Sequence, residues 1–186
     1  VVNRDPLVAL ELALTPIVHR FLQALAHKDR VTRDHVVRVA ELAMRSGRRI
    51  GLDDVRLRAL GLGALLHDIG KLDAPIEILV KPGALTDDEF ETMKRHTVWG
   101  EALLRPWPLL APAAPLVRWH HERADGTGYP DGIPVGDLPD AVALISVCDA
   151  WDAMVSDRPY RDGMPEDRAL AILQDGAGSQ WCERAV

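Results

Sequence analysis

Apolar residues recur along this chain at spacings of three and four, and this periodicity constrains the fold more than any other feature. Such spacing gathers side chains on one face of an α-helix, whereas a half-buried strand shows strict alternation of apolar and polar residues. No stretch of the chain shows convincing alternation. The sequence therefore predicts an all-α fold.

Start and stop signals divide the chain into separate helices. We expect helices over about residues 32–49, 53–67, 86–103, 138–155 and 165–174, and a short helix that ends at His120 and His121. Thr86 and Glu89 have the spacing of a capping box, with Thr86 at the N-cap and Glu89 at N3. Glycine and proline crowd residues 125–132 and exclude regular helix there.

A further apolar stripe lies near the start of the chain and consists of Leu7, Leu10, Leu14, Ile17 and Phe21. These positions fit one face of a core-packing helix, and they also fit the a and d positions of a heptad repeat. Two interpretations stay open: an ordinary core helix, or a dimerising helix joined to an upstream partner. We place a linker or dimerisation helix at residues 1–30 and the main domain at residues 31–186.

The composition limits the classes of function. With 186 residues, 47% of them hydrophobic, the chain can bury the core of one globular domain. Its net charge of -6 argues against a general nucleic-acid binder, which normally has a basic surface. No apolar run approaches the ~20 residues of a membrane span. Cys148 and Cys182 cannot form a disulfide framework, so we expect a reducing, cytoplasmic location.

Histidines and acids stand at predicted helix ends or on predicted apolar faces. The residues concerned are His67 with Asp68, His96, His120 with His121, and Asp149. His96 lies in line with Phe90 and Met93 on what we expect to be one continuous helix, so it should face the core. A buried carboxylate such as that of Asp149 is costly unless it is paired or binds a metal ion. Imidazole and carboxylate ligands together suit Fe, Mn, Zn or Ni rather than Mg or Ca.

Each of these residues alone has an ordinary explanation. His96 fits a hydrogen-bonded core histidine, and Asp149 fits a buried partner of an arginine. Their joint occurrence in separate segments is hard to explain by packing, so we expect a metal site. His19 and His27 belong to the first helix, and we expect both to lie outside that site.

Several of these residues lie in motifs that carry a resemblance to a known family. The motifs are His67-Asp68-Ile69-Gly70-Lys71, His120-His121-Glu122-Arg123, Asp125-Gly126-Thr127-Gly128-Tyr129-Pro130 and Asp157-Arg158-Pro159-Tyr160-Arg161. In this order they resemble the HD-GYP family, a subgroup of HD-domain phosphohydrolases associated with cyclic di-GMP breakdown in bacteria. The resemblance covers about residues 32–173 and implies a bundle of about seven helices around a bimetal site, within residues 31–186.

The resemblance also implies the metal ligands. The residue matching Asp68 bridges two ions in the family, with His35, His67 and Asp149 completing the protein ligands of one ion, and His96, His120 and His121 those of the other. Some members bind a third metal through a glutamate one turn before the first histidine, where this chain has Val31. We therefore expect two transition-metal ions, iron or alternatively manganese. Ala143 and residues 180–183 depart from the family pattern, so the resemblance does not predict how the last helices pack.

Further residues are expected to act on a substrate. Asp68 and Lys71 are the expected catalytic residues, and Lys71 can also contact a phosphate, although alone it would pass for a solvated lysine. The resemblance implies phosphate contacts for Arg158 and Arg161. The resemblance implies that Tyr129 stacks on the substrate or forms a hydrogen bond with it, and a purely structural turn is the alternative. We expect Asp125 to contact the substrate or to orient a ligand histidine.

The resemblance implies an enzyme that hydrolyses cyclic di-GMP to pGpG, GMP or both. A phosphohydrolase for another nucleotide and a non-catalytic receptor for a cyclic dinucleotide or a protein are the alternatives. The intact set of ligand residues argues against the receptor. The expected partners are cyclic di-GMP, a diguanylate cyclase or another protein bound through the Gly-Tyr-Pro loop, an upstream sensor or receiver domain, and a second copy of the chain.

Overall fold

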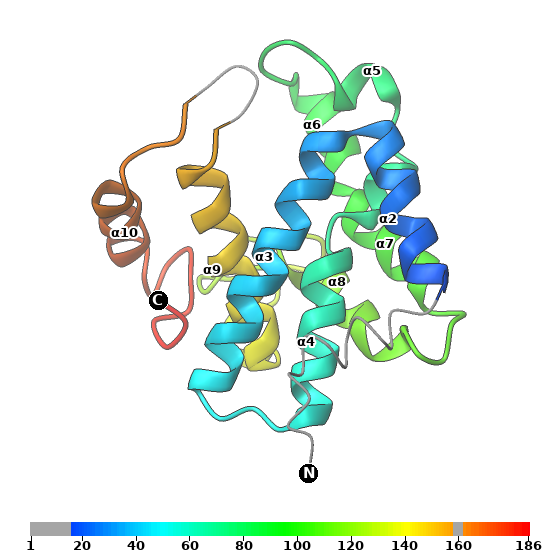
Figure 1. The fold of residues 1–186 in the computed structure, drawn as a ribbon. Helices are drawn as coiled ribbons and strands as arrows, with labels where there is room; N and C mark the ends of the chain where they lie inside the picture. Colours follow the sequence, from blue (N-terminus) through cyan, green and yellow to red (C-terminus); the bar gives the residue numbers. More distant parts are fainter. Residues whose placement is uncertain (1–15, 158–161) are drawn as a thin grey trace.

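The computed structural model describes residues 16–157 and 162–186, and Figure 1 shows how their helices are arranged. Within these ranges the chain forms α-helices and short 3-10 helices, and its β-structure is limited to an isolated bridge between Ala177 and Trp181. The predicted all-α fold is confirmed. No helix of the described residues is long and apolar enough to cross a membrane.

Three long helices form the centre of the molecule. α3 (Arg30–Arg49) packs against both α4 (Asp54–Leu66) and α9 (Asp140–Val155), and Figure 1 shows it running between them. Asp29 and Asp53 cap α3 and α4 by accepting hydrogen bonds from backbone N–H groups. Apolar side chains of the three helices meet in a fully buried core that includes Val36, Leu60 and Ile145.

A second layer brings short elements against this centre. The 3-10 helix η1 (Ile69–Leu72) follows α4 directly and packs against α7 (His96–Leu104), which in turn packs against α8 (Ala114–Trp119). η1 and α7 approach closely because Gly70 has no side chain: a Cβ atom there would lie 1.9 Å from the His96 carbonyl oxygen. The sequence thus places the segments with the predicted ligands side by side.

The prediction of one continuous helix over residues 86–103 is wrong, because the helix is interrupted at Arg95. α6 (Asp87–Lys94) begins with the predicted capping box and ends there, and α7 begins at His96. The His96 ring bonds the Met93 carbonyl at 2.7 Å, and the Thr97 hydroxyl bonds the Lys94 carbonyl at 2.9 Å. Such local side-chain bonds compete with the helical pattern. His96 is buried nonetheless, whereas Phe90 is 46% exposed and lies on no core stripe.

The remaining elements cover the edges. They are α5 (Ile76–Leu79), η2 (Ala111–Ala113), η3 (Val135–Asp137) and α10 (Glu166–Asp175), and residues 125–132 form the predicted irregular loop. α10 packs against α9 (Figure 1). In the tail that departs from the family pattern, Trp181 is buried with Val147 of α9 and Leu173 of α10. Those last helices are therefore packed despite the unusual sequence.

The first described helix, α2 (Pro16–Lys28), packs on α3 and η1. Its Val18 and Leu25 side chains are fully buried, and the Lys28 ammonium donates hydrogen bonds to the Leu72 and Ala74 carbonyls. His19 and His27 are exposed, as expected. Leu7, Leu10 and Leu14 lie outside the described residues, so the domain boundary at residue 30 and the dimerising helix stay predictions.

Candidate metal centre

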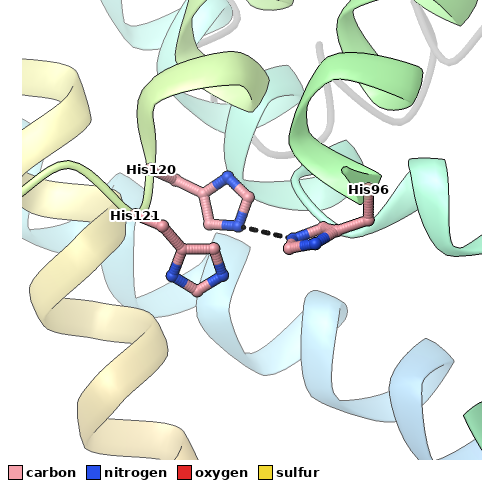
Figure 2. A group of neighbouring side chains, drawn as sticks. All are labelled: His96, His120 and His121. Atoms are coloured by element: carbon pink, nitrogen blue, oxygen red, sulfur yellow. Dashed lines mark hydrogen bonds between the residues drawn. The ribbon is translucent and has the colours of Figure 1, made fainter. Parts of the chain in front are cut away.

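The side chains predicted as metal ligands gather at one place in the fold. Three groups each bring their ligand atoms within 4.8 Å of one another, namely His35 with His67 and Asp149, His96 with His120 and His121, and His67 with Asp68 and His120. They come from α3, α9 and the ends of α4, α7 and α8. Figure 2 shows the rings of the second group pointing toward a common space.

Three of the histidines share one local arrangement. In His67, His96 and His120, Nδ1 lies 2.7 Å from the backbone carbonyl three residues earlier, and each ring stands at a helix end. An Nδ1–H that donates to this carbonyl leaves Nε2 of the neutral ring with a free lone pair. This outer hydrogen bond is the usual way in which a metal-binding histidine is oriented.

The Nε2 atoms provide a test of whether metal ions fit here. Nε2 of His96 and Nε2 of His120 lie 3.3 Å apart (Figure 2), and with both Nδ1 atoms protonated neither nitrogen has a proton to donate to the other. Nε2 of His67 is buried and makes no hydrogen bond with any described residue. Buried polar atoms normally have partners, and an ion in this space would supply them. The donor set therefore fits transition-metal ions.

Asp68 joins the histidine groups. Its Oδ2 atom lies 3.5 Å from Nε2 of His67, and its Oδ1 atom lies 3.5 Å from Nε2 of His96. Lys71, on η1, places its ammonium 2.7 Å from Oδ2. Burial opposes ionisation of Asp68, but Lys71 and the surrounding histidines hold the pKa of this carboxyl well below its usual range. An ionised carboxylate with one oxygen toward each group is suited to bridge two cations.

His35 differs from the other histidines, and its surroundings reveal two residues that the sequence analysis missed. Its Nε2 atom lies 3.0 Å from Asp149, and its Nδ1 atom lies 2.6 Å from Asp152. Arg38 bonds both carboxylate oxygens of Asp152, at 2.6 and 2.9 Å. Arg38 and Asp152 each follow a predicted ligand by three residues on the same helix, and this spacing was the available signal.

Burial sets the charge of His96, His120 and His121. It lowers the pKa of His96 to about 3 and that of His121 to about 4, and it holds the pKa of His120 well below its usual value. Burial also opposes protonation of His35, but its hydrogen bonds to Asp149 and Asp152 raise that pKa to about 9. The histidines with lowered pKa values are neutral at neutral pH, which is the form that binds a metal ion.

The centre opens into a cleft of about 440 Å³. The side chains that line it include Arg38, Lys71, Lys81 and Asp157, together with the predicted ligands His35, Asp68, His121 and Asp149. Lys71 therefore both contacts the predicted bridge and faces the space that a substrate would enter. Arg158 and Arg161 lie outside the described residues, so their phosphate contacts stay predictions.

The Gly-Tyr-Pro loop lies against the centre through an aromatic contact. The ring of Tyr129 packs on that of His121, with centroids 4.7 Å apart and an angle of 30° between the planes. Burial raises the pKa of the Tyr129 phenol, so the ring stays neutral. The Glu122 carboxylate, fully buried and also missed from the sequence, accepts hydrogen bonds from the backbone N–H groups of residues 131–133. Glu122 thereby anchors the loop beside His121.

Asp125 makes its hydrogen bonds within its own loop. Its carboxylate bonds the Arg123 guanidinium and the backbone and hydroxyl of Thr127, all within the loop. The expectation that Asp125 orients a ligand histidine is therefore wrong, because its acceptor positions serve the turn itself. Its contact with a substrate stays a prediction.

Comparison with known proteins identifies the family to which this fold belongs. A family model described as an HD domain matches residues 19–186. The chain belongs to the HD-domain family. The resemblance of this HD domain to the HD-GYP subgroup, predicted from its motifs, is confirmed by similarity to several cyclic di-GMP phosphodiesterases over most of its length.

Two relatives illustrate the range of substrates. The HD domain is 38% identical to a cyclic di-GMP phosphodiesterase of Thermotoga maritima, covering 86% of this chain and 44% of the relative. It is 36% identical to the 3'3'-cGAMP-specific phosphodiesterase 3 of Vibrio cholerae, covering 86% of this chain and 35% of the relative. The chain thus spans less than half the length of these relatives.

A solved structure supports the fold. The crystal structure of a cyclic GMP-AMP-specific phosphodiesterase of Vibrio cholerae matches with a TM-score of 0.69, covering 91% of this chain and 46% of the other. Sequence identity over the match is 13%, so the likeness concerns the arrangement of the helices alone.

Proposed function

We propose that this HD domain hydrolyses cyclic di-GMP with the help of two transition-metal ions. The observation that carries the proposal is the position of Asp68, whose two carboxylate oxygens each face a different histidine. HD-domain phosphohydrolases depend on metal ions, and the side chains around Asp68 form groups suited to hold them. The names of several relatives supply the substrate.

The proposed ligands divide between the two ions. His35, His67 and Asp149 hold one ion, His96, His120 and His121 hold the other, and Asp68 bridges them. We propose iron, with manganese as the alternative, because nitrogen and oxygen donors suit both. Val31, in the position from which a third metal would be bound, has no ligand atom, which supports two ions rather than three.

The residues of the chain then have separate tasks. When bound, two such ions make hydroxide available near neutral pH and neutralise the charge of a phosphodiester. Lys71 offers a cation at the cleft wall to a phosphate oxygen that approaches the bridge. Tyr129 holds His121 by stacking, and its loop borders the centre. Arg158 and Arg161 are proposed to bind the second phosphate, with Asp125 as a further substrate contact.

A second substrate deserves a direct comparison. A 3'3'-cGAMP-specific phosphodiesterase is also among the relatives, at 36% identity over the aligned residues. That dinucleotide has the same two phosphodiesters and differs in one base, so the metal centre alone does not distinguish the two. A non-catalytic receptor is less well supported, because a receptor does not require the complete set of ligand residues.

One assay tests the proposal. The reduced protein is loaded with Fe(II) or Mn(II) and incubated with cyclic di-GMP, in parallel with 3'3'-cGAMP, and the products are separated by chromatography. Formation of pGpG or GMP faster than linearisation of 3'3'-cGAMP is the expected result. Binding of cyclic di-GMP without any product, by protein that holds its metal ions, would instead establish the receptor.

We also propose the setting in which the domain acts. Its two cysteines are free, which fits a reducing compartment such as the cytoplasm. The proposed partners also include an upstream sensor or receiver domain and a second copy of the chain, bound through the first helix. A diguanylate cyclase or another protein is proposed to bind at the Gly-Tyr-Pro loop.

A further inference from the structure

The histidines of the metal centre differ in what holds the nitrogen that faces away from it. His67, His96 and His120 each place Nδ1 against a backbone carbonyl, which is a neutral acceptor. His35 places Nδ1 2.6 Å from Oδ2 of Asp152, which is a carboxylate. Among the described histidines of the centre, His35 is the one with an acidic outer partner.

The Asp152 carboxylate is held in place on its other sides. The Arg38 guanidinium bonds it with two nitrogens, in the two-pronged geometry that fixes both partners. The Ser156 hydroxyl donates a third bond at 3.1 Å. Asp152 is only 6% exposed, whereas the Arg38 side chain is 46% exposed and lines the cleft. Asp152 therefore presents one fixed oxygen to His35.

A carboxylate behind a histidine strengthens the bond between its other nitrogen and a metal ion. It fixes the orientation of the ring and makes the ligating nitrogen more basic, and its loss typically weakens metal binding by about 10–100-fold. The group around His35 also contains the carboxylate of Asp149, whereas His96, His120 and His121 bring three imidazoles. Both differences favour the ion at His35, although binding there must also displace the proton that His35 carries in the metal-free protein.

We propose that Asp152, clamped by Arg38, is a positioning residue that makes the two metal positions unequal. The ion held by His35, His67 and Asp149 binds first and dissociates last, and the ion held by His96, His120 and His121 is the exchangeable one. This inference rests on the two-metal centre of the proposed function. It adds that activity follows the filling of the weaker position, so the availability of metal sets how much of the enzyme is active.

Titration of the metal-free protein with Mn(II) tests the order of binding. Free Mn(II) is measured by electron paramagnetic resonance, and bound Mn(II) by elemental analysis after gel filtration. The wild-type protein should bind in two steps with clearly separated dissociation constants. His35→Ala should remove the tighter step and His121→Ala the weaker one.

Asp152→Asn tests the cause. Asparagine keeps the size and an acceptor oxygen but removes the charge, so the tighter dissociation constant should rise by about 10–100-fold while the weaker one stays within about twofold. Arg38→Gln should move the same step in the same direction by a smaller factor. Asp140→Asn is the matched control, because Asp140 lies on the same helix and pairs with Arg184 at the surface. It should leave both steps unchanged.

The outcomes separate this inference from a general loss of structure and from the proposed function. A single step in the wild-type protein, or equal weakening of both steps by Asp152→Asn, would overturn the inequality. If circular dichroism shows that Asp152→Asn does not fold, Arg38→Gln provides the test instead, because the Arg38 side chain is half-exposed. An unchanged tighter dissociation constant in Arg38→Gln would then contradict the proposed role of Arg38. Two separated steps without hydrolysis of cyclic di-GMP at saturating Mn(II) would support the inequality and refute the proposed activity.

Discussion

At the scale of single residues, the centre depends on hydrogen bonds that hold ligands from behind. The rings of His67, His96 and His120 are turned by carbonyls three residues earlier in their own segments. The Asp68 carboxylate follows His67 directly, so the end of α4 delivers one ligand from each of two adjacent residues. Local sequence, rather than distant packing, thus sets the direction of three of the five histidine donors.

Replacing Asp68 tests the bridge. Asp68→Ala should abolish hydrolysis and reduce the bound metal, because both proposed ions lose a shared anionic ligand. Metal content by elemental analysis and product formation by chromatography check this. Asp140→Asn serves as the surface control. Full activity of the Asp68→Ala protein would contradict the proposed bridge.

Replacing Glu122 tests the anchor of the Gly-Tyr-Pro loop. Glu122→Gln places an amide NH₂ group where a buried oxygen accepts backbone N–H bonds, and leaving such donors unpaired costs about 1–3 kcal/mol. The free energy of unfolding in urea should fall by this amount, and the loop should lose its fixed position beside His121. Glu41→Gln, at an exposed position of α3, should have no such effect. Equal stability of the two variants would contradict the anchoring role of Glu122.

At the scale of elements, the predictions succeeded where signals are local. The cap residues Asp53 and Thr86 placed the starts of α4 and α6 correctly, because a cap is read from a few neighbouring residues. The break at Arg95 was missed, because apolar spacing continues across it and a sequence does not show whether a histidine or threonine side chain will bond the carbonyl three residues earlier. The anchoring roles of Glu122 and Asp152 were missed for the same reason.

More residues of the site were predicted than the apolar periodicity alone allowed. Adjacent pairs such as His67-Asp68 stand out in any sequence, whereas His35 was assigned through the family resemblance. Its place in the centre follows from the packing of α3 against α4 and α9. Spacing places Arg38 and Asp152 on the same helix faces as the predicted ligands, but contacts between distant helices carry no local signal, so the bonds between Asp152, Arg38 and His35 appear only in the fold.

The contact between η1 and α7 provides a prediction at this scale. Gly70→Ala would place a methyl group 1.9 Å from the His96 carbonyl oxygen and 2.5 Å from the Gly100 nitrogen. Since both contacts involve backbone, the elements must separate, and we expect a loss of about 3 kcal/mol or more in the free energy of unfolding. Metal content should fall as well, because Asp68 and His96 move apart.

Gly136→Ala is the matched control for this change, because, its chain neighbours and the nearby backbone of its own helix aside, no described atom lies within 4 Å of the added methyl group. Thermal unfolding of both metal-free variants, together with elemental analysis of the loaded proteins, checks the prediction. If Gly70→Ala behaves like Gly136→Ala, the close crossing does not position the ligands.

At the scale of the whole molecule, buried polarity is concentrated around the metal centre. Buried polar and charged residues that lie there include His35, His67, Asp68, His96, His120 and Asp152, whereas the core between the helices is hydrocarbon. Such a concentration opposes folding unless the groups are paired. Bound ions would provide the missing partners, so metal binding and stability should be coupled.

The metal-free protein should therefore be most stable near pH 6.5. Below this pH the unfolded chain protonates the equivalents of His96, His120 and His121, while burial keeps them neutral in the folded state. Stability then falls by about 1.4 kcal/mol per pH unit for each such histidine. His35 has the opposite sign: its raised pKa, about 9, contributes stability that is present below pH 6.5 and lost as the pH rises through 9.

Urea unfolding of the metal-free protein at pH 5, 6.5 and 9 measures both limbs. Asp152→Asn should flatten the alkaline limb, because it removes a hydrogen bond that raises the pKa of His35, and it should leave the acid limb intact. Equal stability at pH 5 and 6.5 would show that the three buried histidines are protonated in the folded state. Addition of Mn(II) at pH 6.5 should raise the free energy of unfolding, because ions that bind the folded state alone stabilise it by mass action.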